Sequence, residues 1–184
     1  MTSAIIDPTT SQHRNTASGT DAARPASLSG LRVGLLENGK RNAAAVLDAV
    51  GRVLSQKYQV GEVVRLKKEN FAMPMDDELV TQLETATDAV VVGVGDCGSC
   101  SAAAVADGIR LEQTQLPSAV ICTDAFETTG QAMAQLQGDE KYPFLLTPHP
   151  IANLTEEQIA QRAEELADEV AARLLSGRAD SEAK

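Results

Sequence analysis

The chain has 184 residues, which against a soft prior of about 150 residues per domain indicates one domain with some excess. It carries 16 lysine and arginine residues against 26 aspartate and glutamate residues, and the net charge of −10 argues against nucleic acid or an anionic membrane surface as a partner. No apolar run reaches the roughly 18 residues of a membrane helix, and the first residues lack the pattern of a secretory signal. We therefore expect a cytoplasmic protein that binds small molecules or other proteins.

Residues 1–29 are rich in serine and threonine without a sustained hydrophobic period, so we expect an N-terminal tail. Within it, residues 4–8 (Ala-Ile-Ile-Asp-Pro) form a short apolar patch suited to docking on the body or on another subunit. Short aliphatic runs then alternate with helical stretches, which predicts a domain over residues 30–176 and a frayed tail over residues 177–184. We expect strands at residues 31–36, 60–66, 88–94, 118–123 and 143–147, and helices at residues 42–58, 76–85, 100–113, 125–136 and 156–175.

Continuous apolar strands joined by helices predict a parallel sheet that is covered on both faces. We expect a single flavodoxin-like, doubly wound α/β domain with a mainly parallel five-stranded sheet. In such a sheet, ligands bind beyond the carboxyl ends of the strands, near the point where the strand order reverses. The residues that the expected strand ends bring together are Asn38 and Lys40, residues 96–101, Cys122, Thr123, Asp124 and His149.

The strongest local signal is Asp-Cys-Gly-Ser-Cys at residues 96–100, a C-x-x-C sequence between an expected buried strand and a helix. Backbone N–H groups and the helix dipole stabilise a thiolate at such a place, so Cys97 is expected to have a lowered pKa and to act as the nucleophile. Cys100, one helical turn further on, is placed to attack an adduct on Cys97 and to leave an intramolecular disulfide. Glycine allows close approach of a substrate, and free N–H groups can bind a carboxylate. The candidate substrate-binding residues in this segment are Gly98, Ser99 and Ser101.

Other polar residues at this edge are candidates that each have a structural alternative. Asp96 is either catalytic or a cap of the following helix. His149, between two prolines, is either a general acid or base or a rigid loop residue. Cys122 is either an additional thiol of the site or a small core residue. The remaining candidates for substrate binding are Asn38, Lys40, Thr123 and Asp124, while Asn42 either joins them or caps its helix.

The three cysteines do not suggest a disulfide framework, because their number is odd and we expect a reducing compartment. Two cysteines could supply half of a zinc site, but the sequence has no second C-x-x-C and no paired histidines. We therefore expect no metal and no bound cofactor. Turnover would instead depend on an external thiol or a thioredoxin-type reductant.

These motifs resemble the UGSC family, which is named for selenocysteine or cysteine followed by Gly-Ser-Cys. Beyond residues 96–100, the resemblance extends to residues 4–8, to residues 37–40 (Glu-Asn-Gly-Lys) and to residues 148–150 (Pro-His-Pro), and so covers most of the chain. A more distant similarity, over residues 88–153, is to the selenoprotein B subunits of glycine reductase and proline reductase. In those reductases a selenolate displaces a nitrogen leaving group from carbon, and a thiol then releases the product.

The resemblance to the reductases implies that Cys97 takes the place of the selenocysteine and Cys100 that of the resolving thiol. Sulfur is a weaker nucleophile than selenium, and the reductases also use a pyruvoyl group on a partner to activate the amine. The substrates of the reductases are therefore not carried over to this chain.

We expect a reductase-like, thiol-dependent enzyme in which Cys97 attacks a small, carboxylate-bearing substrate and Cys100 resolves the adduct, with net reductive cleavage of a carbon–heteroatom bond. One alternative is a lyase or isomerase of the aspartate/glutamate racemase kind, in which Cys97 and Cys122 face each other as acid and base. Another is a non-catalytic subunit that docks in a heteromeric complex through its acidic surface and residues 5–6. The expected partners are the substrate and a reductant protein or low-molecular-weight thiol, in a homo- or hetero-oligomer.

Overall fold

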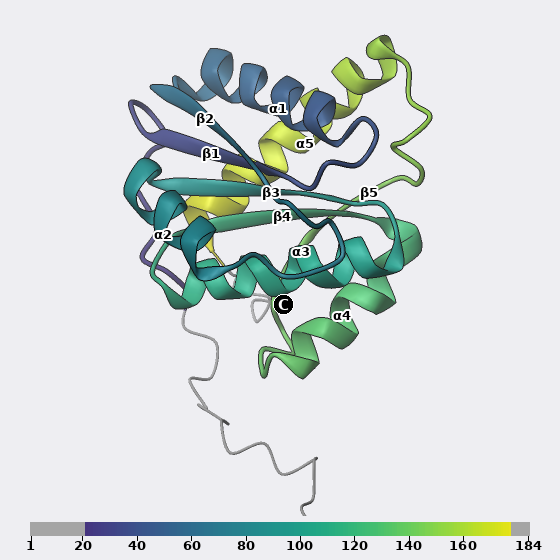
Figure 1. Cartoon of the computed structure of the whole chain (residues 1–184). Helices are drawn as coiled ribbons and strands as arrows, with labels where there is room; N and C mark the ends of the chain where they lie inside the picture. The colour runs from purple at the N-terminus through teal and green to yellow at the C-terminus, as the bar shows by residue number, and fades with distance from the viewer. Residues whose placement is uncertain (1–20, 178–184) are drawn as a thin grey trace, which may run out of the picture.

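A five-stranded sheet runs through the centre of the computed structural model, which describes residues 21–177 (Figure 1). The strands are β1 (Arg32–Glu37), β2 (Glu62–Lys67), β3 (Ala89–Gly95), β4 (Ser118–Thr123) and β5 (Leu145–Thr147). The helices are α1 (Ala43–Tyr58), α2 (Asp77–Ala86), α3 (Gly98–Gln113), α4 (Glu127–Leu136) and α5 (Glu156–Ser176), with a short 3-10 helix, η1 (Asp124–Phe126), before α4. Within residues 21–177, no helix combines the length and the apolar content that a bilayer crossing requires.

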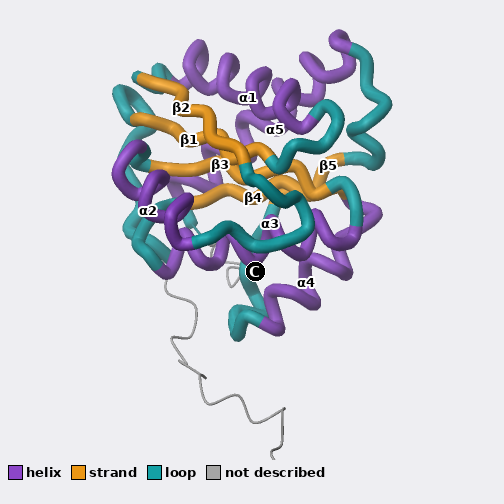
Figure 2. The backbone as a smooth tube through the Cα atoms, viewed as in Figure 1, coloured by secondary structure: helices purple, strands orange, loops and turns teal. Residues whose placement is uncertain are grey.

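The strand order is β2-β1-β3-β4-β5, and every neighbouring pair of strands is parallel. Helices α1 and α5 cover one face of the sheet, and α2, α3 and α4 cover the other (Figures 1 and 2). The expected flavodoxin-like, doubly wound α/β fold is therefore confirmed. The order of the strands reverses between β1 and β3, so the loops after these two strands flank the crevice in which such folds bind ligands.

Two apolar cores, one on each face, hold the helices to the sheet. Strands β3 and β4 are buried along their whole length, as expected for central strands of a sheet that is covered on both sides. On the α1 and α5 face, Leu47 and Val50 pack with Leu166 and Val170. Each such side chain contributes about 1.5–3 kcal/mol by leaving water. The packing fixes where the loops at the carboxyl ends of the strands lie.

The N-terminal boundary of the domain differs from the expected one. Ala22 and Leu28 are buried, the N–H of Ala22 donates to Glu112 Oε2 at 2.7 Å, and Ser29 pairs with Val60. Residues 21–29 therefore belong to the folded body, because contacts with α3 and β2 order a segment whose local composition indicated a tail. Residues 1–20, with the apolar patch at residues 4–8, and residues 178–184 lie outside the described residues.

Four element boundaries also move by two residues from the expected ones, and one of them is the start of α4 at Glu127, which follows η1. Strand β2 begins at Glu62 because Gln59 has a positive φ of 58° and the chain turns there. Strand β5 begins at Leu145, after Pro143, whose nitrogen cannot donate to a ladder. Helix α3 begins at Gly98, two residues earlier than expected, because Cys97 is its N-cap.

Candidate functional site

The loops after β1, β3 and β5 are bonded together at the carboxyl edge of the sheet. The Asn38 amide donates to the carbonyl oxygen of Val94 at 2.8 Å. The Asn42 amide donates to the carbonyl oxygen of Ile151 at 2.9 Å and to two further carbonyls of the same loop. Asp96 accepts from the N–H of Ile151 at 3.2 Å. Asn42 therefore neither caps α1 with its side chain nor faces a ligand, but holds the loop after β5.

Cys97 and Cys100 lie at the first turn of α3 and form a disulfide, with their Cα atoms 5.2 Å apart. Cys97 is the N-cap, and its Sγ lies 3.4 Å from the backbone nitrogen of Cys100, which donates to it. Cys97 is half-buried, whereas Cys100 is only 1% exposed. An external molecule can therefore reach the sulfur of Cys97 more readily than that of Cys100, which is the asymmetry expected of an attacking and a resolving thiol.

Asp96, the residue before Cys97, forms a close pair with His149. His149 Nδ1 lies 2.9 Å from Asp96 Oδ1, and the side chains are 37% and 9% exposed respectively. Thr123 Oγ1 also lies 3.2 Å from Nδ1. Both contacts use Nδ1, so Nε2 has no partner among residues 21–177. A carboxylate that accepts from Nδ1–H fixes the ring and leaves Nε2 to exchange a proton with a ligand.

The loop that carries His149 is held from two more sides. The backbone N–H of His149 donates to Asp124 Oδ1 at 3.0 Å, and the Phe126 ring meets the imidazole edge-on with 5.3 Å between the ring centres. From α5, Arg162 Nη1 donates to Thr147 Oγ1 at 2.7 Å and to the carbonyl oxygen of Pro148 at 2.9 Å. The imidazole is therefore positioned by three elements, β5, η1 and α5.

Arg162 is a positioning residue that the sequence did not indicate. It lies on α5 next to the apolar stripe that includes Ile159 and Ala163, so it resembles an ordinary boundary residue of an amphipathic helix. Its contacts with Thr147 and Pro148 arise only from the packing of α5 beside β5. A lone arginine at the edge of the stripe was the single available signal.

Several of the predicted substrate-binding side chains are buried. Asn38 supports the loop after β3, and the Thr123 hydroxyl donates to the carbonyl oxygen of Gly95 at 3.2 Å as well as facing His149. Ser101 is also buried, on the inner side of α3. These three side chains are placed to support the edge rather than to reach a ligand. The other predicted substrate-binding residues at this edge of the sheet are at least partly exposed, namely Gly98, Ser99, Lys40 and Asp124.

Cys122 lies behind the site, inside β4. Burial raises the pKa of its thiol to about 12, although contacts with Ser101 and with the backbone of Gly95 oppose the shift. A Cβ atom on Gly95 would lie 2.8 Å from Cys122 Sγ, so glycine is needed for this packing. Cys122 is a neutral core thiol at neutral pH. The racemase-like alternative needs a second reactive thiol that faces the substrate, and Cys122 does not supply it.

The UGSC family model matches residues 4–176 of the chain. The chain belongs to the UGSC family. The match includes residues 4–8 and every residue of the site, from Asn38 on the loop after β1 to Arg162 on α5. No curated protein matches the chain. In this UGSC protein, the cysteine pair, the Asp96–His149 pair and Arg162 therefore all lie within the family region.

Proposed function

We propose that this UGSC protein is a thiol-dependent enzyme that cleaves a carbon–heteroatom bond of a small, carboxylate-bearing substrate by reduction. The observation that carries the proposal is the asymmetry of the cysteine pair. Cys97 is accessible at the N-terminus of α3, and buried Cys100 lies within bonding reach of its sulfur. The imidazole of His149 is held on Asp96, the residue next to Cys97.

The reaction balances with two thiols and no bound cofactor. The Cys97 thiolate attacks the substrate carbon, a carbon–sulfur bond forms, and the bond to the heteroatom breaks. The Cys100 thiolate then attacks the sulfur of Cys97, so that the carbon–sulfur bond breaks and the carbon takes up a proton. The substrate gains two electrons and the two cysteines lose them as their disulfide forms. An external thiol must reduce this disulfide before the next turnover.

His149 supplies the proton that the departing heteroatom needs. Its Nδ1 is bonded to Asp96, so Nε2 is the atom that exchanges the proton. The N–H groups at the start of α3, at Gly98 and Ser99, donate to the carboxylate of the substrate, because a helix N-terminus attracts anions. Lys40, half-buried on the loop after β1, adds a positive charge at the same edge of the sheet.

Trapping the adduct tests this proposal. Cys100→Ser should accumulate a covalent adduct with one member of a panel of amino and hydroxy acids, seen as a mass increase of the intact protein that maps to Cys97. The wild-type protein should release the product, and Cys97→Ser should show no adduct. Cys122→Ser is the matched control and should behave as the wild type. An adduct that maps to Cys122, or that persists in Cys97→Ser, would contradict the proposal.

A further inference from the structure

The loop between β2 and α2 exposes two large apolar side chains. Phe71 is 41% exposed and Met73 is 58% exposed. Within residues 21–177, the only other large hydrophobic side chain with such exposure is Leu136 at the end of α4, at 76%. Two large apolar side chains that are exposed within three residues of one loop are typical of a surface that meets another molecule.

This loop is fixed to the helix that begins at the cysteine pair. Lys68 forms a buried ion pair with Asp107 of α3, and the N–H of Met75 donates to the same carboxylate at 2.7 Å. Arg110 of α3 donates to the carbonyl oxygen of Met75 at 2.7 Å. Both ends of the segment that carries Phe71 and Met73 are therefore anchored. The exposure of the two side chains does not come from a loose loop.

The loop also lies on the same edge of the sheet as Cys97. It follows the carboxyl end of β2, and the Lys40 ammonium, on the loop after β1, lies 3.6 Å from the centre of the Phe71 ring. The Asn38 amide, two residues before Lys40, bonds the loop after β1 to Val94, close to the cysteine pair. Phe71 is thus connected through neighbouring loops to the surroundings of Cys97.

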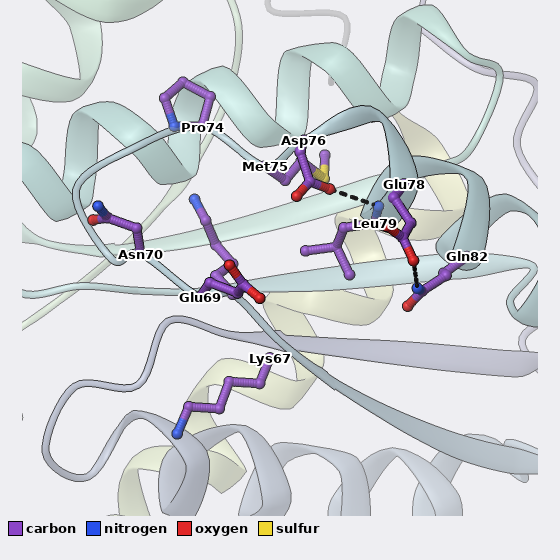
Figure 3. A pocket seen from close by; sticks show the side chains of 10 residues that line it. Lys67, Glu69, Asn70, Pro74, Met75, Asp76, Glu78, Leu79 and Gln82 are labelled. Carbon is purple, nitrogen blue, oxygen red and sulfur yellow. Dashed lines mark hydrogen bonds between the residues drawn. The ribbon is translucent and has the colours of Figure 1, made fainter.

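The rim of this apolar pair is acidic. A cleft of about 290 Å³ lies between the loop and the start of α2, and its lining includes the carboxylates of Glu69, Asp76 and Glu78 (Figure 3). The three side chains are exposed. Of the two lysines in the lining, Lys68 is buried against Asp107 and Lys67 pairs with Glu37. Apart from the Lys40 ammonium on the Phe71 ring, a partner that covers Phe71 and Met73 would therefore meet an excess of negative charge on the side of this cleft, which favours basic residues on its own rim.

We propose that Phe71, Met73 and this acidic rim dock a protein dithiol with a basic rim, which reduces the Cys97–Cys100 disulfide. The inference rests on the proposed function, because that function oxidises the pair once in each turnover. Contacts on the same edge of the sheet as the sulfur would hold a protein reductant in place, and a small thiol would not use them.

The exchange is a two-electron transfer. A thiolate of the partner attacks the accessible sulfur of Cys97, the Cys97–Cys100 bond breaks, and Cys100 leaves as a thiolate that takes up a proton. The second thiol of the partner then attacks the partner's own sulfur in the mixed disulfide and releases the Cys97 thiolate. The partner leaves as its disulfide.

The test compares a protein reductant with a small one on the oxidised full chain. Two thioredoxins, one with a basic and one with an acidic rim around its cysteines, are kept reduced by thioredoxin reductase and NADPH, and NADPH consumption gives the rate. Phe71→Ser combined with Met73→Ser should slow reduction by the basic thioredoxin about tenfold, as expected for the loss of central interface contacts. Reduction by dithiothreitol should change less than about twofold. Leu136→Ser, which removes an exposed side chain far from this loop in sequence, is the matched control and should leave both rates unchanged.

The proposal also predicts that the basic thioredoxin reduces the wild-type chain faster than the acidic one. It would be overturned if neither thioredoxin reduced the disulfide while dithiothreitol did, or if the double variant kept the wild-type rate. Equal slowing with dithiothreitol, or equal slowing in Leu136→Ser, would also overturn it. The proposed function is tested separately by the adduct on Cys97, which forms in reduced protein without any thioredoxin.

Discussion

The two ends of α3 carry polar clusters of opposite character. At the N-terminal end, Cys97 is half-buried, and His149, which pairs with the neighbouring Asp96, is partly exposed. At the C-terminal end, Glu112 is buried and accepts hydrogen bonds from the N–H groups of Ala22 and Ser118. It also binds the guanidinium groups of Arg24 and Arg173.

The two clusters differ in which of their polar atoms a ligand can still reach. The carboxylate of Glu112 is occupied by partners from three segments of the chain, namely residues 21–29, β4 and α5, so its charge serves to hold residues 21–29 and α5 against α3. At the other end, the partners of His149 all use Nδ1 or the backbone, and Cys97 caps the helix with a sulfur that a ligand can still approach. We infer that the closed cluster maintains the fold, whereas the open cluster carries the chemistry.

The largest expected effect concerns the open cluster at the N-terminal end of α3. His149→Gln should lower turnover of the trapped substrate by a factor of about 100 to 10,000, because glutamine cannot transfer the proton that the leaving group needs. The midpoint of urea unfolding and the rate of Cys97 alkylation should stay close to those of the wild type. Normal turnover, or a loss of activity that follows only from unfolding, would show that His149 merely shapes its loop.

The second largest effect is expected in the closed cluster around Glu112. Glu112→Gln should lower the free energy of unfolding by about 3 kcal/mol, because two largely buried guanidinium groups lose one of the two carboxylates that bind them, while that of Asp21 remains. Urea titration measures this change, and Glu169→Gln on the exposed side of α5 is the control, with little expected effect. At a urea concentration where both proteins are folded, Cys97 alkylation should be unchanged. A stable Glu112→Gln protein with altered Cys97 reactivity would contradict the separate roles of the two clusters.

Much of the fold could be predicted from the sequence, because the signals for it are local. The apolar runs at β3 and β4 and the stripe on α5 specify strand and helix without reference to distant residues. The carboxyl-edge rule then brought Cys97 and His149 to one place. The role of a residue could not be predicted where it depends on a partner that is distant in the sequence.

Particular residues show why those roles were not predictable. Ala22 sits in a polar segment, yet its N–H meets Glu112, 90 residues further along the chain. Asp96 was considered as a helix cap, but Cys97 takes that position and Asp96 turns to the loop after β5. Arg162 meets Pro148 only after α5 has packed. Each of these contacts is decided by tertiary packing rather than by local propensity.

A smaller effect is expected from the support of His149. Arg162→Met should reduce turnover about tenfold, because it removes two hydrogen bonds to the residues before His149 and so loosens the position of the imidazole. The pH profile of turnover should shift as well, which a purely structural loss would not cause. Glu165→Gln, which removes the salt bridge of Arg162 on α5 but leaves its bonds to Thr147 and Pro148, should retain the wild-type rate and profile. An unchanged profile in Arg162→Met would contradict a positioning role.

The smallest effect concerns an exposed ion pair, which sharpens the contrast with Glu112. The hydrogen bond from Arg32 lowers the pKa of Asp88, although partial burial opposes this. The pair therefore stabilises the fold above the ordinary pKa of an aspartate, and this contribution is lost as the pH falls through the lowered value. Asp88→Asn should shift the urea midpoint at pH 7 by far less than Glu112→Gln, since both side chains are more than a third exposed. The difference from the wild type should vanish in acid, and a difference that grew in acid would contradict the assignment.

The most direct test of the central claim is the alkylation of the three cysteines in the reduced protein as a function of pH. The account predicts that iodoacetamide modifies Cys97 first, with the lowest apparent pKa of the three, because Cys97 caps α3 and is accessible. Cys122 should stay unmodified until the protein unfolds, because burial raises the pKa of its thiol to about 12. Peptide mapping of samples quenched at several times identifies the modified residue. Faster labelling of Cys100 or Cys122 than of Cys97 in the folded protein would contradict the account.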